Sequence, residues 1–167
     1  EALVNYWGRG GRAKDVRPLL ESVASVPGGV SVAISHLLPP FARQRLYTYP
    51  VPPERPPAIN QDCHWTAFNF FNVEPDNRFC DENEVIKALD NEYYRVFGNL
   101  QLGDIVMFFI EGDRAIHSAV YIAEDILFTK NGSIASRPWM LTTLEDMKGY
   151  YPTLKPKDIR YYRKKNI

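Results

Sequence analysis

The sequence has little cysteine, no excess of charge of either sign and no long run of apolar residues. Its two cysteines, Cys63 and Cys80, are too few for a disulfide framework, although a single bridge between them remains open. Twenty basic residues balance twenty acidic ones, which argues against nucleic acid as a partner. No segment approaches the roughly 18 uninterrupted apolar residues of a membrane-spanning helix. These absences exclude a disulfide-rich scaffold, a basic nucleic-acid-binding module and a helical membrane protein.

Two further absences concern the start of the chain. The glycines of residues 8–11 lack the spacing of a phosphate-binding loop, so the sequence does not predict nucleotide binding. The chain begins at Glu1 without a basic and apolar leader. From this we expect a trimmed or mature form, and the cellular compartment stays open. The length and composition are otherwise those of a globular domain. A chain of 167 residues, 45% of them hydrophobic, is long enough to enclose one core.

Apolar periodicity predicts helices in the first half of the chain and strands in the second. Spacings of three and four positions indicate helices, whereas a continuous apolar run such as residues 105–110 indicates a strand covered on both faces. Helices followed by a meander of short strands predict an α+β domain, with helices packed on a central, mostly antiparallel sheet. We expect helices over residues 14–26, 30–38, 41–46, 65–73, 81–97 and 143–150, and strands over residues 105–110, 116–123, 126–130, 139–141 and 158–163.

A proline-rich segment separates two parts of the chain. Residues 47–57 contain five prolines, which exclude helix and central strand and favour an extended backbone. We therefore expect residues 1–58 to form a helical N-terminal extension with a proline-rich loop. Residues 59–167 are expected to form the domain that carries the chemistry, and the two parts to make one compact unit. The loop should lead the chain to Cys63 and form one wall of a cleft.

The chemistry is expected at Cys63 and His117. Cys63 precedes an aromatic helix for which Asp62 is a suitable N-cap, and the amides at a helix N-terminus favour a thiolate and can hold an oxyanion. His117 begins a predicted strand and is a suitable base for that nucleophile. If His117 faces the Cys63 helix, the next strand offers either residues 127, 129 and 131 or residues 126, 128 and 130 on the same side. The first set contains Thr129 and Asn131, either of which is able to accept the second N–H of the imidazole.

Three motifs of the sequence resemble those of a known family. They are Asp62-Cys63-His64-Trp65, Gly103-Asp104-Ile105-Val106-Met107-Phe108-Phe109 and His117-Ser118-Ala119-Val120-Tyr121-Ile122. The chain is similar in them, over about residues 59–163, to the NlpC-type cysteine peptidases, which are papain-like bacterial cell-wall hydrolases. The resemblance implies a papain-like fold with Cys63 as nucleophile and His117 as general base and acid. It also implies a third residue near Thr129, where the family usually has histidine, asparagine or glutamine, and Asn131 is the chemically better candidate.

The same resemblance assigns residues around the nucleophile. The family uses an upstream tyrosine near the oxyanion site, a position that Tyr47 or Tyr49 matches. His64 and Trp65 replace the small Ser-Gly pair of the family. Together with Asp62 they are therefore expected to line a bulkier cleft floor.

We expect a cysteine hydrolase that cleaves amide bonds through an acyl-enzyme. The resemblance implies a peptide or muropeptide of the bacterial cell wall as substrate and an extracytoplasmic location. Two alternatives stay open, namely a related thiol acyltransferase and a catalytically inactive papain-like module that binds a peptide or partner. The absence of the family's histidine at Thr129 favours the inactive module. No cofactor is expected, and no metal either, because the adjacent Cys63 and His64 rarely reach one ion together and structural zinc needs four ligands.

Overall fold

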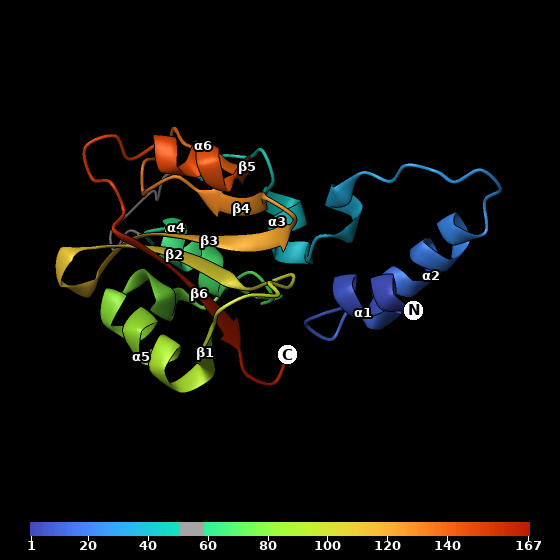
Figure 1. The fold of residues 1–167 in the computed structure, drawn as a ribbon, viewed down its shortest axis with the longest axis horizontal. Helices are drawn as coiled ribbons and strands as arrows, with labels where there is room; N and C mark the ends of the chain where they lie inside the picture. The colour runs from blue at the N-terminus through green and yellow to red at the C-terminus, as the bar shows by residue number, and fades with distance from the viewer. Residues whose placement is uncertain (51–58) are drawn as a thin grey trace.

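A six-stranded sheet forms the centre of the protein in the computed structural model, which describes residues 1–50 and 59–167 (Figure 1). The strand order is β1-β6-β2-β3-β4-β5, and each of the five neighbouring pairs is antiparallel. This sheet, with helices packed on it, confirms the α+β class. The strands are β1 (Tyr93–Val96), β2 (Ile105–Ile110), β3 (Arg114–Ala123), β4 (Ile126–Lys130), β5 (Trp139–Thr143) and β6 (Asp158–Lys164).

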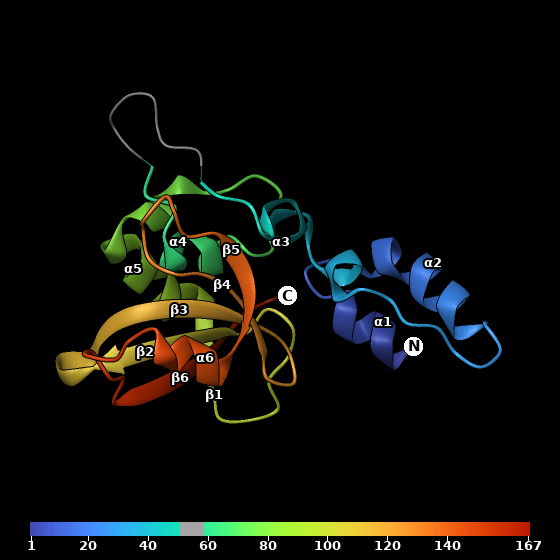
Figure 2. The same cartoon turned by 90° about the horizontal axis from the view of Figure 1, so that it is seen from above.

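Helices cover both faces of the sheet (Figure 2). On one face Ile105 and Met107 belong to the core that also contains Phe68 and Val85 of α4 and α5. The alternate residues of β2 pack on the opposite face in a smaller core with Met147 of α6. Burial on both sides explains why β2 is apolar at every position. The described helices are α1 (Ala2–Trp7), α2 (Ala13–Ala24), α3 (Pro40–Arg45), α4 (Cys63–Phe68), α5 (Glu82–Glu92) and α6 (Leu144–Gly149), with 3₁₀ turns η1 (Ile34–Leu37), η2 (Asn77–Cys80) and η3 (Glu111–Asp113).

None of the helices in residues 1–50 and 59–167 is long and apolar enough to cross a membrane. The part of the proline-rich loop in residues 51–58 lies outside the described residues.

Two predicted helices end earlier than expected. The helix predicted over residues 65–73 begins at Cys63 and stops at Phe68. The side-chain amide of Asn69 ends it by donating to the carbonyl of Trp65 (3.0 Å) and to the carbonyl of Asp76 (3.1 Å). The prediction of one helix over residues 81–97 is wrong beyond Glu92, because the chain continues there as the edge strand β1.

The strand β1 depends on a partner far along the chain. It pairs with β6, which places Val96 opposite Tyr161. Aromatic and β-branched residues favour such a strand once a neighbour is present. Helix α1 was also not expected, since the glycines that follow it dominate the sequence signal there.

The N-terminal extension is held to the sheet by hydrogen bonds to backbone carbonyls. The Tyr6 hydroxyl donates to the carbonyl of Ile122 at 2.7 Å, and the Arg9 Nε donates to the carbonyl of Leu102 at 2.9 Å. Figure 2 shows helices α1 and α2 projecting to one side of the sheet. Their apolar residues nevertheless belong to the same continuous core as α4 and β2, so the extension and the sheet share one interior.

An aromatic ring links the extension to the sheet more closely still. Phe71 lies between Gly10 and Gly103, and a Cβ atom added at either glycine would overlap its ring. Both glycines have φ in the left-handed region, at +74° and +90°, which side chains larger than hydrogen rarely adopt. The two positions therefore require glycine for conformation and for space.

Candidate active site

Cys63 stands at the first position of α4, as the sequence predicts. The Asp62 carboxylate caps the helix by accepting from the backbone N–H of Trp65 at 2.9 Å. The Asp62 carbonyl accepts from the Thr66 hydroxyl at 2.6 Å, and that hydroxyl in turn accepts from the Trp139 indole at 2.9 Å. This chain of bonds fixes the start of the helix, and hence the cysteine, against β5.

The Cys63 thiol lies in a dry site and is protonated at neutral pH. The residue is only 5% exposed, and this burial, with the charge of Asp62 adding to it, raises the pKa of the thiol to about 12. Hydrogen bonding from the backbone of Ser118, His64 and Cys63 itself acts in the opposite direction and lowers the pKa. The sulfur thus faces backbone donors suited to an anion, but burial outweighs them in this conformation.

His117 is fully buried on β3. Its Nε2 lies 3.0 Å from the Thr129 hydroxyl and its Nδ1 lies 2.7 Å from the Tyr151 hydroxyl. Burial, with the charge of His64 adding to it, lowers the pKa of the imidazole to about 3. The histidine is therefore neutral at physiological pH.

The hydrogen bonds around His117 select one tautomer. The Thr129 hydroxyl has a single proton and donates it to the Ser118 carbonyl at 2.9 Å. Its oxygen is then left to accept from Nε2–H of His117, and Nδ1 accepts from the Tyr151 hydroxyl. We infer that Nδ1 is the nitrogen without a proton, so it is the one able to act as a base, although its lone pair is bonded to Tyr151.

His117 lies on the side of the sheet opposite to α4. Its ring packs near Phe108 and Tyr151, with centroid distances of 6.0 Å and 5.3 Å, on the face that α6 covers. Ser118 faces α4 instead, and its hydroxyl lies 2.8 Å from Nδ1 of His64. No hydrogen bond joins Cys63 to His117 among the described residues. The condition that His117 faces the cysteine helix is therefore not met, whereas Thr129 does share a face with His117.

Tyr151 is a site residue that the sequence did not indicate. Besides its bond to His117, its hydroxyl lies 3.4 Å from Oδ1 of Asn131, so Asn131 reaches the imidazole only through the tyrosine. Burial raises the pKa of Tyr151 above its ordinary value, and a charge on Cys63 acts in the same direction. Tyr151 follows α6 in a segment without periodicity, so only the fold brings it to His117.

Lys130 is a second residue that sequence analysis did not select. It is buried at the end of β4, and its Nζ donates to the carbonyls of Gly132 at 2.6 Å and Ile134 at 3.1 Å. Burial lowers the pKa of the amine, while negative charges on Asp62 and Cys63 raise it. A buried cation therefore stands within electrostatic range of the nucleophile. A lysine at the end of a mostly apolar strand is the signal that could have revealed it.

The predicted lining residues lie in different environments. Trp65 is 1% exposed and packs against Phe41 and Trp139, so its ring belongs to the core and offers no surface to a substrate. Tyr47 exposes its side chain to solvent while its backbone N–H donates to the Trp139 carbonyl at 2.7 Å. Tyr49 lines a hollow of about 320 Å³ beside Trp139. No hydrogen bond joins either tyrosine to Cys63 in the part of the chain that the structure describes.

His64 lines a separate pocket of about 260 Å³ with Cys80 and Glu82. Burial lowers the pKa of His64, while the charges of Asp62 and Glu82 raise it. Both cysteines are free, which answers the open question of a bridge. No group of three or more potential metal ligands occurs among residues 1–50 and 59–167.

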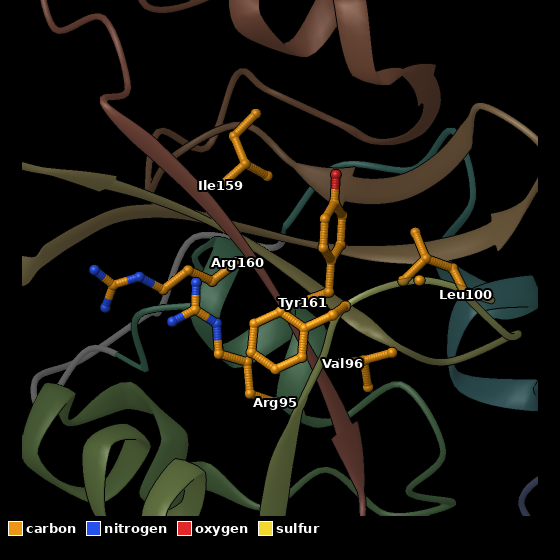
Figure 3. Close-up of a pocket in the computed structure, with 8 residues that line it drawn as sticks. Arg95, Val96, Leu100, Ile159, Arg160 and Tyr161 are labelled. Atoms are coloured by element: carbon orange, nitrogen blue, oxygen red, sulfur yellow. The ribbon is translucent and has the colours of Figure 1, made fainter.

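A further hollow lies over the edge strand β1 and its neighbour β6. It has a volume of about 370 Å³ and is lined by side chains that include Val96, Leu100, Arg160 and Tyr161 (Figure 3). The Arg160 guanidinium is already paired with Asp158 at 2.6 Å. The lining contains no cysteine or histidine, so this hollow is not part of the Cys63–His117 site.

Comparison with known proteins gives no match for this chain, whether with family models, with curated proteins or with solved structures.

Proposed function

We propose that the protein is a cysteine hydrolase that cleaves amide bonds through an acyl-enzyme on Cys63. The observation that carries the proposal is the position of the Cys63 sulfur at the start of α4, facing backbone donors of Ser118, His64 and Cys63. Such donors stabilise both a thiolate and the oxyanion of a tetrahedral intermediate. The base of this proposal is the neutral imidazole of His117, whose tautomer Thr129 selects. Because the ring lies on the face of the sheet away from α4 and bonds Tyr151, the reaction requires a movement that brings Nδ1 to the sulfur.

The reaction divides into two steps. His117 takes the thiol proton, the sulfur attacks the carbonyl carbon, and the C–N bond breaks as the imidazolium returns that proton to the leaving amine. Water, deprotonated by His117, then hydrolyses the thioester and releases the acid. An amine or alcohol in place of water makes the same site an acyltransferase. By its motifs, the substrate we propose is a peptide of the bacterial cell wall, recognised within a papain-like fold.

A second candidate is a catalytically inactive module that binds a peptide or partner. It is favoured by the buried, protonated thiol and by the His117 ring, both of whose nitrogens already have partners other than Cys63. Under this proposal Cys63 is a packing residue and the imidazole network is structural.

Thiol reactivity separates the two candidates. Cys80 is an internal reference, because it is free and more exposed than Cys63. Each cysteine is measured alone, Cys63 in the Cys80→Ser variant and Cys80 in the Cys63→Ser variant. If the protein is a hydrolase, the rate of alkylation by iodoacetamide near neutral pH should be higher for Cys63 than for Cys80. The hydrolase proposal also expects His117→Ala to slow Cys63. Slow alkylation of Cys63 that is indifferent to His117 would favour the inactive module.

Substrate cleavage provides the second test. Purified peptidoglycan and synthetic stem peptides are incubated with the protein, and new amino groups are quantified by amine labelling and mass spectrometry. We expect cleavage by the unmodified chain and none by Cys63→Ser. Cysteine reactivity without cleavage of these peptides would retain a reactive thiol but reject cell-wall peptides as the substrate.

A further inference from the structure

The segment between α6 and β6, residues 150–157, covers the base nitrogen of His117. Tyr151 is the contact residue, with its hydroxyl 2.7 Å from Nδ1 and its ring centroid 5.3 Å from that of the imidazole. In the tautomer inferred above, Nδ1 carries no proton and its lone pair accepts from the Tyr151 hydroxyl. A hydroxyl that donates to this lone pair occupies the position that the thiol proton needs.

The same segment is weakly attached to the rest of the protein. Its fixed points are the backbone bonds from Tyr151 to the Lys148 carbonyl (3.1 Å) and from Lys157 to the Phe109 carbonyl (2.9 Å). Between these points, residues 152–156 make no backbone–backbone hydrogen bond with other described residues, and most of their side chains are exposed. Segments with few backbone bonds and little burial open at low free-energy cost.

Space for a displaced ring is present next to the site. A groove of about 410 Å³ is lined by Tyr151 together with Lys148, Pro152 and Ile159. Tyr151 thus contacts the groove and the imidazole with the same side chain. A ligand that enters the groove meets Tyr151 before it meets His117.

We propose that Tyr151 is a displaceable cap on His117, which keeps the base unavailable to Cys63 until the 150–157 segment moves. This inference rests on the proposed function, because it assigns His117 the role of base. A charge on Cys63 acts on Tyr151, so the sulfur lies within electrostatic range of the cap. Because the imidazole lies on the face of the sheet away from α4, the same movement has to bring the sulfur to Nδ1. Tyr151 is therefore a positioning residue and takes no part in bond making.

The test is the rate of Cys63 alkylation by iodoacetamide near neutral pH in a Cys80→Ser background. Tyr151→Phe removes only the hydroxyl and keeps the ring that packs near Phe108 at 6.2 Å. We expect the rate to rise about three- to tenfold, the equilibrium effect of releasing one hydrogen bond. In the double variant Tyr151→Phe/His117→Gln the increase should disappear. Tyr150→Phe is the matched control, because among the described residues the hydroxyl of Tyr150 bonds Met140 Sδ, at 3.9 Å, and not His117. This substitution should leave the alkylation rate unchanged.

Three results would overturn the cap. They are an unchanged or lower rate in Tyr151→Phe, a gain that survives the loss of His117, and an equal gain in Tyr150→Phe. The ¹⁵N chemical shift of His117 Nδ1 gives an independent readout, and it should move in Tyr151→Phe but not in Tyr150→Phe. A His117-dependent gain without peptide cleavage would keep the cap and reject the hydrolase. Peptide cleavage by the unmodified chain, with no effect of Tyr151→Phe on the alkylation rate, would keep the hydrolase and reject the cap.

Discussion

Burial of a neutral histidine makes the stability of this protein sensitive to acid. An ordinary histidine has a pKa of 6.5, and burial lowers that of His117 to about 3. The unfolded chain therefore binds a proton below pH 6.5 that the folded chain excludes until about pH 3. Stability from this residue is complete above pH 6.5 and is lost as the pH falls from there toward 3, because the unfolded state then binds more protons.

The size of the effect follows from the difference between the two pKa values. Each pH unit below 6.5 costs about 1.4 kcal/mol, so at pH 5 the free energy of unfolding should be about 2 kcal/mol lower than at pH 7.5. The loss approaches 4–5 kcal/mol near pH 3, which is comparable to the whole stability of many domains, about 5–15 kcal/mol. For a chain of this length, about 2 kcal/mol lowers Tm by about 4–8 °C.

The assay compares the protein with His117→Gln by urea denaturation, followed by tryptophan fluorescence at pH 7.5 and pH 5. All other ionisable groups are common to both proteins, so the difference between the pH dependences of their unfolding free energies reports on His117. We expect the unmodified protein to lose about 2 kcal/mol more than the variant. Equal losses would refute a neutral buried imidazole, as would an NMR titration that places the His117 pKa near 6.5.

Three further substitutions test contacts that hold the site in place. Asp62→Ala should cost about 1 kcal/mol in thermal or urea unfolding by removing the cap of α4, whereas Asp62→Asn keeps an acceptor and should cost much less. Gly103→Ala should cost more than about 1 kcal/mol, because it combines a left-handed φ with overlap on the Phe71 ring, and urea midpoints measure this. Arg163 holds the buried Asp104 carboxylate with two bonds of 2.8 and 2.7 Å. Arg163→Leu should therefore cost about 3–5 kcal/mol, because it leaves a buried carboxylate without its partner, and urea denaturation at neutral pH measures this.

Local signals in the sequence were enough to predict the helix start at Cys63 and the strands that surround it. The N-cap at Asp62 and the apolar run over residues 105–110 each act within a few residues, and the structure has both. The strict alternation of side chains along a strand also put Thr129 beside His117. These features could be predicted because the residues that cause them are close together in the sequence.

The remaining features depend on contacts between distant segments. Both faces of β3 are apolar, so the alternation of side chains does not tell which face packs on α4. The packing of the two cores, one on each side of the sheet, decides this. The strand β1 exists because β6 pairs with it from about 70 residues away. Tyr151 reaches His117 from a separation of 34 residues, and no property of its own segment indicates this contact.

The position of Phe71 between Gly10 and Gly103 has a consequence for how this protein changes in evolution. The three positions come from the N-terminal extension, the turn after α4 and the turn before β2, yet they share one small volume. A side chain larger than hydrogen at residue 10 or 103 is compatible only with a smaller residue at 71. In chains that share this fold, we therefore expect these three positions to covary. That triplet would identify relatives that keep the extension, even where the residues of the site have diverged.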